Sequence, residues 1–160
     1  MTSDRSDRLH YLPVGLDVRG KHCIVIGGGS VGTRKVHTLS LAGAIVSVIS
    51  PTVTEELAAE IEAGCARWVR DCFQESHLDG AFLVIAATDD EDLNAAIIQA
   101  AAERGALVCD ASSAERSQVI FGALHTNEGA IIAVFTDGRD PSHARRTRDR
   151  IAHLLDQGSN

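Results

Sequence analysis

The feature that most constrains the fold is a series of short apolar runs, rich in β-branched residues, that alternate with amphipathic segments. Strand-like runs at "HCIVIGG", "AIVSVIS", "GAFLVIAAT" and "ALVCDAS" are separated by helical patterns over residues 31–42, 53–63 and 93–104. This alternation predicts right-handed βαβ units and a parallel sheet that is covered by helices on both faces. We therefore expect a doubly wound α/β domain over residues 1–113.

The pattern changes over residues 114–160. The stretch "QVIFGALHTNEGAIIAVFTDG" predicts two strands joined by a turn at "TNEG", in which Asn127 and Gly129 supply the turn chemistry. Asp140 is a natural N-cap, and Pro141 suits the first position of an amphipathic helix that ends near residue 155. A small β-hairpin followed by a helix is therefore expected after the α/β domain.

A glycine motif lies between the first predicted strand and its helix. Gly27, Gly29 and Gly32 satisfy G-x-G-x-x-G, which in this context is typical of a Rossmann-like fold. Gly27 would make the tight turn, Gly29 would let the backbone approach a pyrophosphate, and Gly32 would let helix and strand pack closely. The backbone amides near Ser30 and Val31 would then face the anion. A glycine corner used only for packing is the alternative, but the flanking βαβ units favour nucleotide binding.

The end of the second predicted strand bears on the choice of cofactor. The run "AIVSVISPTV" ends in Ser50, Pro51 and Thr52, where an acidic residue often binds the ribose. Hydroxyls or backbone groups would have to contact the ribose instead. This strand end has no arginine for a 2′-phosphate either, so the sequence favours NAD over NADP.

The third predicted strand ends in "AATDDEDLN", which places Thr88 and Asp89 at the carboxyl edge of the sheet, where open α/β sheets bind ligands. Asp89 or Asp90 would equally serve as the N-cap of the following helix, with acidic residues that complement its dipole. The two roles are compatible, and both stay open at this point.

Composition excludes several classes of protein. The formal net charge of −7 argues against general affinity for nucleic acids or anionic membranes, and no apolar run approaches the roughly 20 residues of a membrane span. The four cysteines are scattered without a C-x-x-C pair, and the seven histidines lack the spacing of metal ligands. We expect a cytoplasmic protein with reduced thiols and no fixed metal site.

Several motifs occur together in an order that resembles the precorrin-2 dehydrogenases of sirohaem synthesis, including the N-terminal module of bifunctional sirohaem synthases. They are "GGGSVGTRK", "IAATDD", "IFGAL" and "DPSHARR", and the resemblance covers nearly the whole chain. It implies a Rossmann domain followed by a dimerisation region, and hence a homodimer. It also implies oxidation of precorrin-2, a tetrapyrrole, to sirohydrochlorin with NAD as hydride acceptor. Some members also insert ferrous iron.

The resemblance implies roles for particular residues. Ser30 and Val31 at the glycine turn, and Pro51 and Thr52 after the second strand, would contact NAD, with Thr88 beside them. Positioning of the substrate and a carboxylate that accepts a proton would carry most of the catalysis.

The chain departs from the family at the proposed catalytic position. Members usually read "N-V-V-D" at the end of the fifth strand, and alignment without gaps places Ser112 where that aspartate acts as acid or base. Side chains alternate along a strand, so Asp110 would face the same way and could offer its carboxylate from about 7 Å away. Asp110 would equally serve to cap a loop, and both readings stay open.

A second departure lies in "FTDGRDP", where the family reads approximately "S-T-G-G-x-S-P". Phe135 and Asp137 replace a hydroxyl and a glycine, whereas Thr136 is retained as a candidate substrate contact. Arg145 and Arg146 fall where the family also has arginines, and guanidinium groups suit the carboxylates of a tetrapyrrole. A solvated basic helix is the alternative reading.

Two other functions compete with the dehydrogenase. An NAD-sensing regulatory module would share the glycine turn, but such modules usually carry the acidic ribose residue that this chain lacks after the second strand. A catalytically degenerate family member would bind NAD or a tetrapyrrole without turnover, and the residues at Ser112 and Phe135 keep this alternative open.

Overall fold

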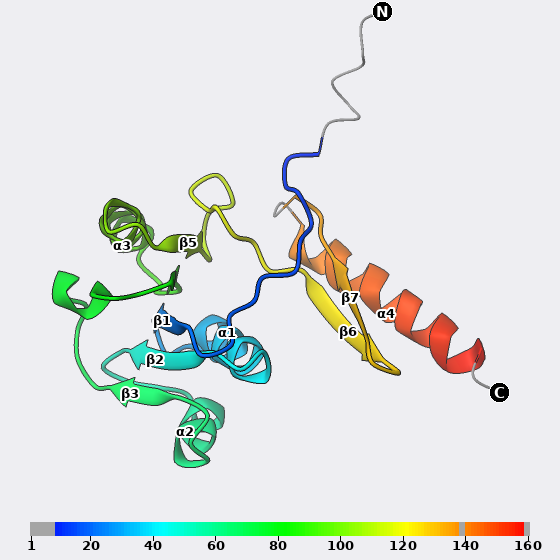
Figure 1. Ribbon diagram of the computed structural model, residues 1–160, viewed down its shortest axis with the longest axis horizontal. Helices are drawn as coiled ribbons and strands as arrows, with labels where there is room; N and C mark the ends of the chain where they lie inside the picture. The colour runs from blue at the N-terminus through cyan, green and yellow to red at the C-terminus, as the bar shows by residue number, and fades with distance from the viewer. Residues whose placement is uncertain (1–8, 138–139, 159–160) are drawn as a thin grey trace, which may run out of the picture. The chain divides into compact units, whose positions relative to one another are not determined.

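The computed structural model describes residues 9–137 and 140–158, and the chain divides into two compact units. One unit is Leu16–Val119. The other combines the described residues before Leu16 with those from Ile120 onward. Figure 1 shows the elements of each unit.

The unit Leu16–Val119 contains a five-stranded parallel sheet with the strand order β3-β2-β1-β4-β5. The chain runs outward from β1 to β3, crosses back, and continues from β4 to β5 on the other side. This arrangement confirms the expected doubly wound α/β fold. The strands are β1 (His22–Ile26), β2 (Ile45–Ile49), β3 (Arg67–Val69), β4 (Leu83–Ala86) and β5 (Leu107–Asp110).

The strands are nearly continuous apolar runs because both faces of the sheet are covered. In β4, all four residues are buried, and in β1 every residue after His22 is buried or nearly so. The helices α1 (Ser30–Leu41) and α3 (Glu91–Glu103) contribute apolar residues such as Val36 and Ile97 to the interior. This packing fixes the positions of the strand ends, and therefore of the loops that follow them.

Two helices of this unit begin at side chains that cap their free amides. Thr54 accepts a hydrogen bond from Leu57 N at the start of α2 (Glu55–Glu62), and Asp90 accepts bonds from the amides of Asp92 and Leu93 at the start of α3. Of the two candidate N-caps in "TDDEDLN", Asp90 is therefore the one that caps α3. A short 3₁₀ turn, η2 (Glu75–Leu78), connects β3 to β4.

The second unit is a β-hairpin with one helix. The antiparallel strands β6 (Ala123–Asn127) and β7 (Ala130–Val134) pack one face against α4 (Pro141–Gly158), and Asp140 caps that helix by accepting a bond from His143 N at 2.8 Å. The hairpin and helix were expected, but the first strand begins later than "QVIF". The first two of these residues belong to the first unit, where the amides of Gln118 and Val119 donate to Val108 O.

The hairpin turn differs in detail from the expectation. Glu128 and Gly129 are its two central residues, with φ of 47° and 85° respectively. Positive φ at both positions defines a type I′ turn, which matches the twist of the strands. Glu128 therefore occupies the left-handed position, and Asn127 is the last residue of β6.

None of the helices in the described part of the chain is both long enough and apolar enough to cross a membrane.

Candidate functional site

A cavity of about 450 Å³ lies at the carboxyl edge of the parallel sheet. The segments that follow β1, β2, β3 and β4 all line it, so it lies where the strand order reverses between β1 and β4. Open α/β sheets bind ligands at this position. Five of the residues predicted to contact a cofactor line the cavity together: Gly27, Gly29, Pro51, Thr52 and Thr88.

The glycine turn has little room for side chains on one side and open space on the other. Gly27 has φ of 113°, and a Cβ there would collide with the carbonyl oxygen of Ala87. A Cβ on Gly32 would collide with the carbonyl oxygen of Gly27, so α1 packs closely on the preceding loop. A Cβ on Gly29, by contrast, would meet nothing within 4 Å. The backbone at Gly29 is thus open to a ligand.

The N-terminus of α1 is suited to an anion. The first bond of the helix runs from Thr33 N to the Gly29 oxygen at 2.9 Å, so the amides of Ser30, Val31 and Gly32 precede the helical ladder. Among the described residues, no side chain caps this helix at Gly29, and its first turn carries no acidic residue. Both α2 and α3 have a capping side chain and acidic first turns. The dipole of α1 is therefore free to attract a pyrophosphate.

The end of β2 forms another part of the wall. The Ser50 hydroxyl accepts a bond from Gly28 N at 3.1 Å and donates to Thr52 O at 2.6 Å, so it holds the two loops together. Thr52 is exposed and lines the cavity with Pro51. Of the two hydroxyls expected to contact a ribose, the one on Thr52 is thus better placed than the one on Ser50.

Sequence reasoning missed the segment after β3. Asp71, Cys72 and Phe73 line the same cavity, although they lie about 20 residues after the strand end where an acidic residue was sought. Trp68 of β3 donates its indole N–H to Ser50 O at 2.9 Å and fixes β3 against the end of β2. The parallel pairing of β2 and β3 brings the ends of both strands to one edge of the sheet. Recognising that pairing in the sequence would have indicated Asp71 as a candidate.

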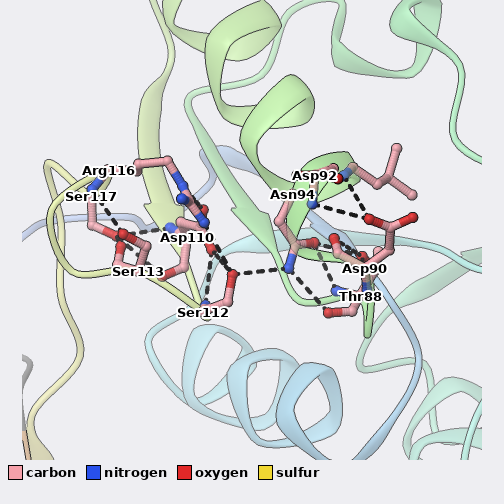
Figure 2. A network of polar contacts seen from close by, with 10 residues as sticks. Thr88, Asp90, Asp92, Asn94, Asp110, Ser112, Ser113, Arg116 and Ser117 are labelled. Carbon is pink, nitrogen blue, oxygen red and sulfur yellow. Dashed lines mark hydrogen bonds and ion pairs between the residues drawn. The ribbon is translucent and has the colours of Figure 1, made fainter.

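Beside this cavity, a polar cluster links the end of β4 to the loop after β5 (Figure 2). The Asp110 side chain ends β5 and is fully shielded from solvent. Its Oδ1 accepts bonds from Ser112 N at 2.8 Å and Ser112 Oγ at 2.6 Å, and its Oδ2 accepts one from Arg116 Nε at 2.6 Å. Ser117 Oγ accepts a bond from Asp110 N at 2.8 Å. Both oxygens of this carboxylate are therefore hydrogen-bonded by residues of the loop that follows it.

These contacts determine the charge of Asp110. Burial alone would raise the pKa of the carboxyl, but the hydrogen bonds from Ser112 and the ion pair with Arg116 outweigh it and hold the pKa below its ordinary value. Asp110 is therefore ionised at neutral pH.

The expected geometry of Asp110 and Ser112 is wrong. The strand ends at Asp110, and Ala111 and Ser112 belong to the following turn, so strand alternation does not relate the two side chains. Instead, the turn folds the Ser112 hydroxyl onto the carboxylate. Asp110 does cap its loop, as the second reading held. Ser112 is the exposed member of the pair.

The remaining predicted residues belong to the second unit. Thr136 Oγ1 donates to Asp140 O at 2.7 Å, next to the start of α4. Arg145 and Arg146 are exposed on the first turns of this helix, and Arg145 donates to Ser142 Oγ at 3.3 Å. Asp137 has φ of 51°, a conformation that glycine adopts more readily.

Within residues 9–137 and 140–158, no group of three or more His, Cys, Asp or Glu is placed to hold a metal ion. The four cysteines are free, with Cys23 and Cys109 buried and Cys65 and Cys72 exposed. Burial raises the pKa of the Cys23 thiol to about 11, so this group is chemically inert at neutral pH.

The fold, the glycine turn and the bare helix N-terminus define a dinucleotide-binding domain. A family model described as "Putative NAD(P)-binding" matches residues 14–123. The chain belongs to this NAD(P)-binding family.

Two curated proteins are similar to this chain over most of its length. The chain is 38% identical to "Siroheme synthase 1" of Pectobacterium atrosepticum, over 92% of the chain and 31% of that protein. It is also 38% identical to the siroheme synthase of Photobacterium profundum, over 93% of the chain and 32% of that protein. The chain thus spans about a third of these curated relatives.

A solved structure extends the similarity to the fold. It is described as "SirC, precorrin-2 dehydrogenase", and superposes with a TM-score of 0.76 at 27% identity, covering 90% of this chain and 71% of that one. Together with the siroheme synthases, it confirms the family resemblance drawn from the motifs.

Proposed function

We propose that this chain is an NAD-dependent dehydrogenase that oxidises precorrin-2 to sirohydrochlorin. The observation that carries the proposal is the cavity at the bare N-terminus of α1, in a chain similar over 90% of its length to SirC, precorrin-2 dehydrogenase. The amides of Ser30 and Val31 would bind the pyrophosphate, and Pro51, Thr52 and Thr88 would line the rest of the dinucleotide site. When bound, the nicotinamide supplies the hydride acceptor.

The preference for NAD over NADP rests on the charges near the cavity. Asp71 lines the wall together with Thr52, and a carboxylate there would disfavour a 2′-phosphate and accept a hydrogen bond from a ribose hydroxyl. Arg70 lies nearby, but its guanidinium is over the Trp68 ring and its Nε donates to Pro51 O at 3.3 Å.

Asp110 and Ser112 are the groups we propose to handle the proton. Loss of a hydride removes an electron pair from the macrocycle and makes a neighbouring C–H acidic, so a weakly basic carboxylate suffices. The exposed Ser112 oxygen would take the proton on the lone pair that otherwise accepts the long 3.4 Å bond from Arg116 Nη2, while its own hydrogen passes to Asp110 Oδ1, 2.6 Å away. Asp110 is shielded from solvent, and this relay gives it access to the substrate without a change in its loop.

Thr136, Arg145 and Arg146 are proposed to bind the carboxylates of the tetrapyrrole. We also propose a homodimer, supported by an apolar hairpin face on which Leu124, Ile131 and Phe135 are exposed. The free thiols support a reducing, cytoplasmic location. Iron insertion stays a prediction from the resemblance.

Anaerobic incubation of the protein with precorrin-2 and NAD tests the proposal. NADH and the absorption spectrum of sirohydrochlorin should appear together, at a rate proportional to the protein concentration. Replacing NAD by NADP should lower kcat/KM. Binding of NAD without either product would instead indicate a catalytically degenerate or NAD-sensing protein, and failure to bind NAD would contradict the cofactor site itself.

A further inference from the structure

Asn94 of α3 joins the wall of the dinucleotide cavity to the Asp110 cluster (Figure 2). Its side chain is completely buried. Asn94 Nδ2 donates to Thr88 O at 3.0 Å and to Ser112 Oγ at 3.2 Å. Asn94 Oδ1 accepts bonds from Thr88 N at 3.1 Å and Thr88 Oγ1 at 2.6 Å. One carboxamide thus contacts a residue of the cavity and a residue of the proposed proton relay.

Every hydrogen-bonding position of this carboxamide is used. The group has two N–H donors and an oxygen with two lone pairs, and four bonds fill them. The orientation of the amide is also determined, because the backbone N–H of Thr88 can only donate and its C=O can only accept. Neither an apolar residue nor an aspartate would satisfy the same four partners.

The bond from Asn94 determines which way the Ser112 hydroxyl points. Ser112 Oγ has one hydrogen, which it donates to Asp110 Oδ1, and its lone pairs accept from Asn94 Nδ2 and, at 3.4 Å, from Arg116 Nη2. A donor on that side prevents the hydroxyl from turning its hydrogen away from Asp110. The direction of the relay therefore depends on the amide nitrogen of Asn94.

We propose that Asn94 is a positioning residue with two roles. Its oxygen and one N–H hold Thr88 at the edge of the dinucleotide cavity, and its other N–H orients the Ser112 hydroxyl toward Asp110. This inference rests on the proposed dehydrogenase function for its catalytic consequence, but the geometry of the cluster can be tested without turnover.

The variant Asn94→Asp acts mainly on the second role. It retains the oxygen that accepts from Thr88 N and Thr88 Oγ1, so two of the three hydrogen bonds to Thr88 remain. The donor to Ser112 is replaced by a second acceptor, so two carboxylates compete for one hydroxyl hydrogen. The Kd for NADH should change by less than about threefold, whereas kcat should fall by at least about tenfold. Protonation of the new carboxyl restores a donor, so kcat should recover as the pH is lowered, while the wild-type rate does not rise.

Asn94→Ala removes both roles and should raise the Kd for NADH as well as lower kcat. The control is Ser47→Ala, which removes a buried hydroxyl that is 3.0 Å from His22 Nε2, within the sheet and outside the cavity lining. It should lower the unfolding midpoint without changing Kd, kcat or the pH profile. If Asn94→Asp behaves like Ser47→Ala in all three, Asn94 is merely structural and the proposal is overturned.

Amide hydrogen exchange tests the cluster independently of precorrin-2. The segment 110–117 is held by internal bonds such as Ser112 N to Asp110 Oδ1 and Ser117 N to Ala114 O. Asn94→Asp should accelerate exchange in this segment while NADH affinity is retained, and Ser47→Ala should not. A wild-type protein that binds NADH but does not oxidise precorrin-2 would contradict the proposed function alone. Unchanged exchange in Asn94→Asp would contradict the positioning role.

Discussion

Asp110 is a buried carboxylate whose partners all come from the next seven residues of the chain. Its folded-state pKa lies below the unfolded value because Ser112 and Arg116 stabilise the charged form more than burial opposes it. A depressed pKa contributes stability that is fully present above the unfolded pKa of about 4 and is lost as the pH falls through the folded value. The loop after β5 should therefore loosen only in acid.

Replacing Arg116 by glutamine should weaken this loop. Arg116→Gln leaves Asp110 Oδ2 without its ion pair, so the pKa of Asp110 rises and the acid transition moves to higher pH. The free energy of unfolding at neutral pH should fall by about 1–3 kcal/mol, the cost of an unsatisfied buried acceptor. Urea unfolding over a series of pH values measures both effects.

The matched control is Arg104→Gln, because Arg104 pairs with the exposed residues Glu75 and Asp79. An exposed pair contributes less than about 1 kcal/mol. Equal losses in the two variants would show that the Asp110 pair is no stronger than a surface ion pair.

Cys72 offers a chemical test of where the dinucleotide binds. It is exposed and lines the cavity, whereas Cys65 is exposed outside the lining. In the native protein, a thiol reagent should modify these two residues and spare Cys23 and Cys109. NADH should slow modification of Cys72 severalfold and leave Cys65 unaffected, as mass spectrometry of the labelled peptides would measure. Equal protection of both thiols, or of neither, would contradict the assigned site.

At the scale of elements, two glycines at the N-terminus of α1 should differ in whether a substitution affects cofactor binding or stability. Gly29 has φ of −75° and open space around it, so Gly29→Ala should cost less than about 1 kcal/mol in unfolding free energy. The added methyl group would nevertheless occupy the path of the pyrophosphate, and the Kd for NAD should rise by about tenfold or more. Calorimetric titration and urea unfolding measure the two quantities.

Gly32→Ala should show the opposite balance, because its methyl group would collide with the carbonyl oxygen of Gly27. Unfolding should then become easier by more than 1 kcal/mol, as overpacking typically costs about 1–3 kcal/mol. A stable Gly32→Ala variant together with an unfolded Gly29→Ala variant would reverse the assignment of the two glycines.

The helices, strands and glycine turn could be predicted because their signals are local. Strand runs, the caps at Asp90 and Asp140, and the G-x-G-x-x-G motif each depend on neighbours within a few residues. Asn94 and Asp71 could not be found in this way, because their roles depend on which strand ends meet at one edge. The Asp110–Ser112 contact was mispredicted for a related reason: the expectation extended the strand by two residues, and the chain turns at Asp110.

At the scale of the whole molecule, the proposed homodimer can be tested on the hairpin. Ile131 is 77% exposed, on the face of the hairpin that does not pack on α4. If this face forms the subunit interface, Ile131→Asp buries a charge there and should produce a monomer in sedimentation velocity. Leu154→Asp is the control, since Leu154 is 67% exposed on α4. A wild-type monomer, or an unaltered dimer in Ile131→Asp, would contradict the proposal.

The bond between Trp68 and Ser50 gives the molecule an intrinsic optical reporter. Trp68 is the single tryptophan of the chain, and its indole N–H binds the backbone of a residue that lines the dinucleotide cavity. Tryptophan emission overlaps the absorption of reduced nicotinamide, so NADH bound in this cavity would quench the indole by energy transfer. The equilibrium and rate of NADH binding would then be readable from the unlabelled protein as a change in fluorescence, and NAD binding from its competition with NADH.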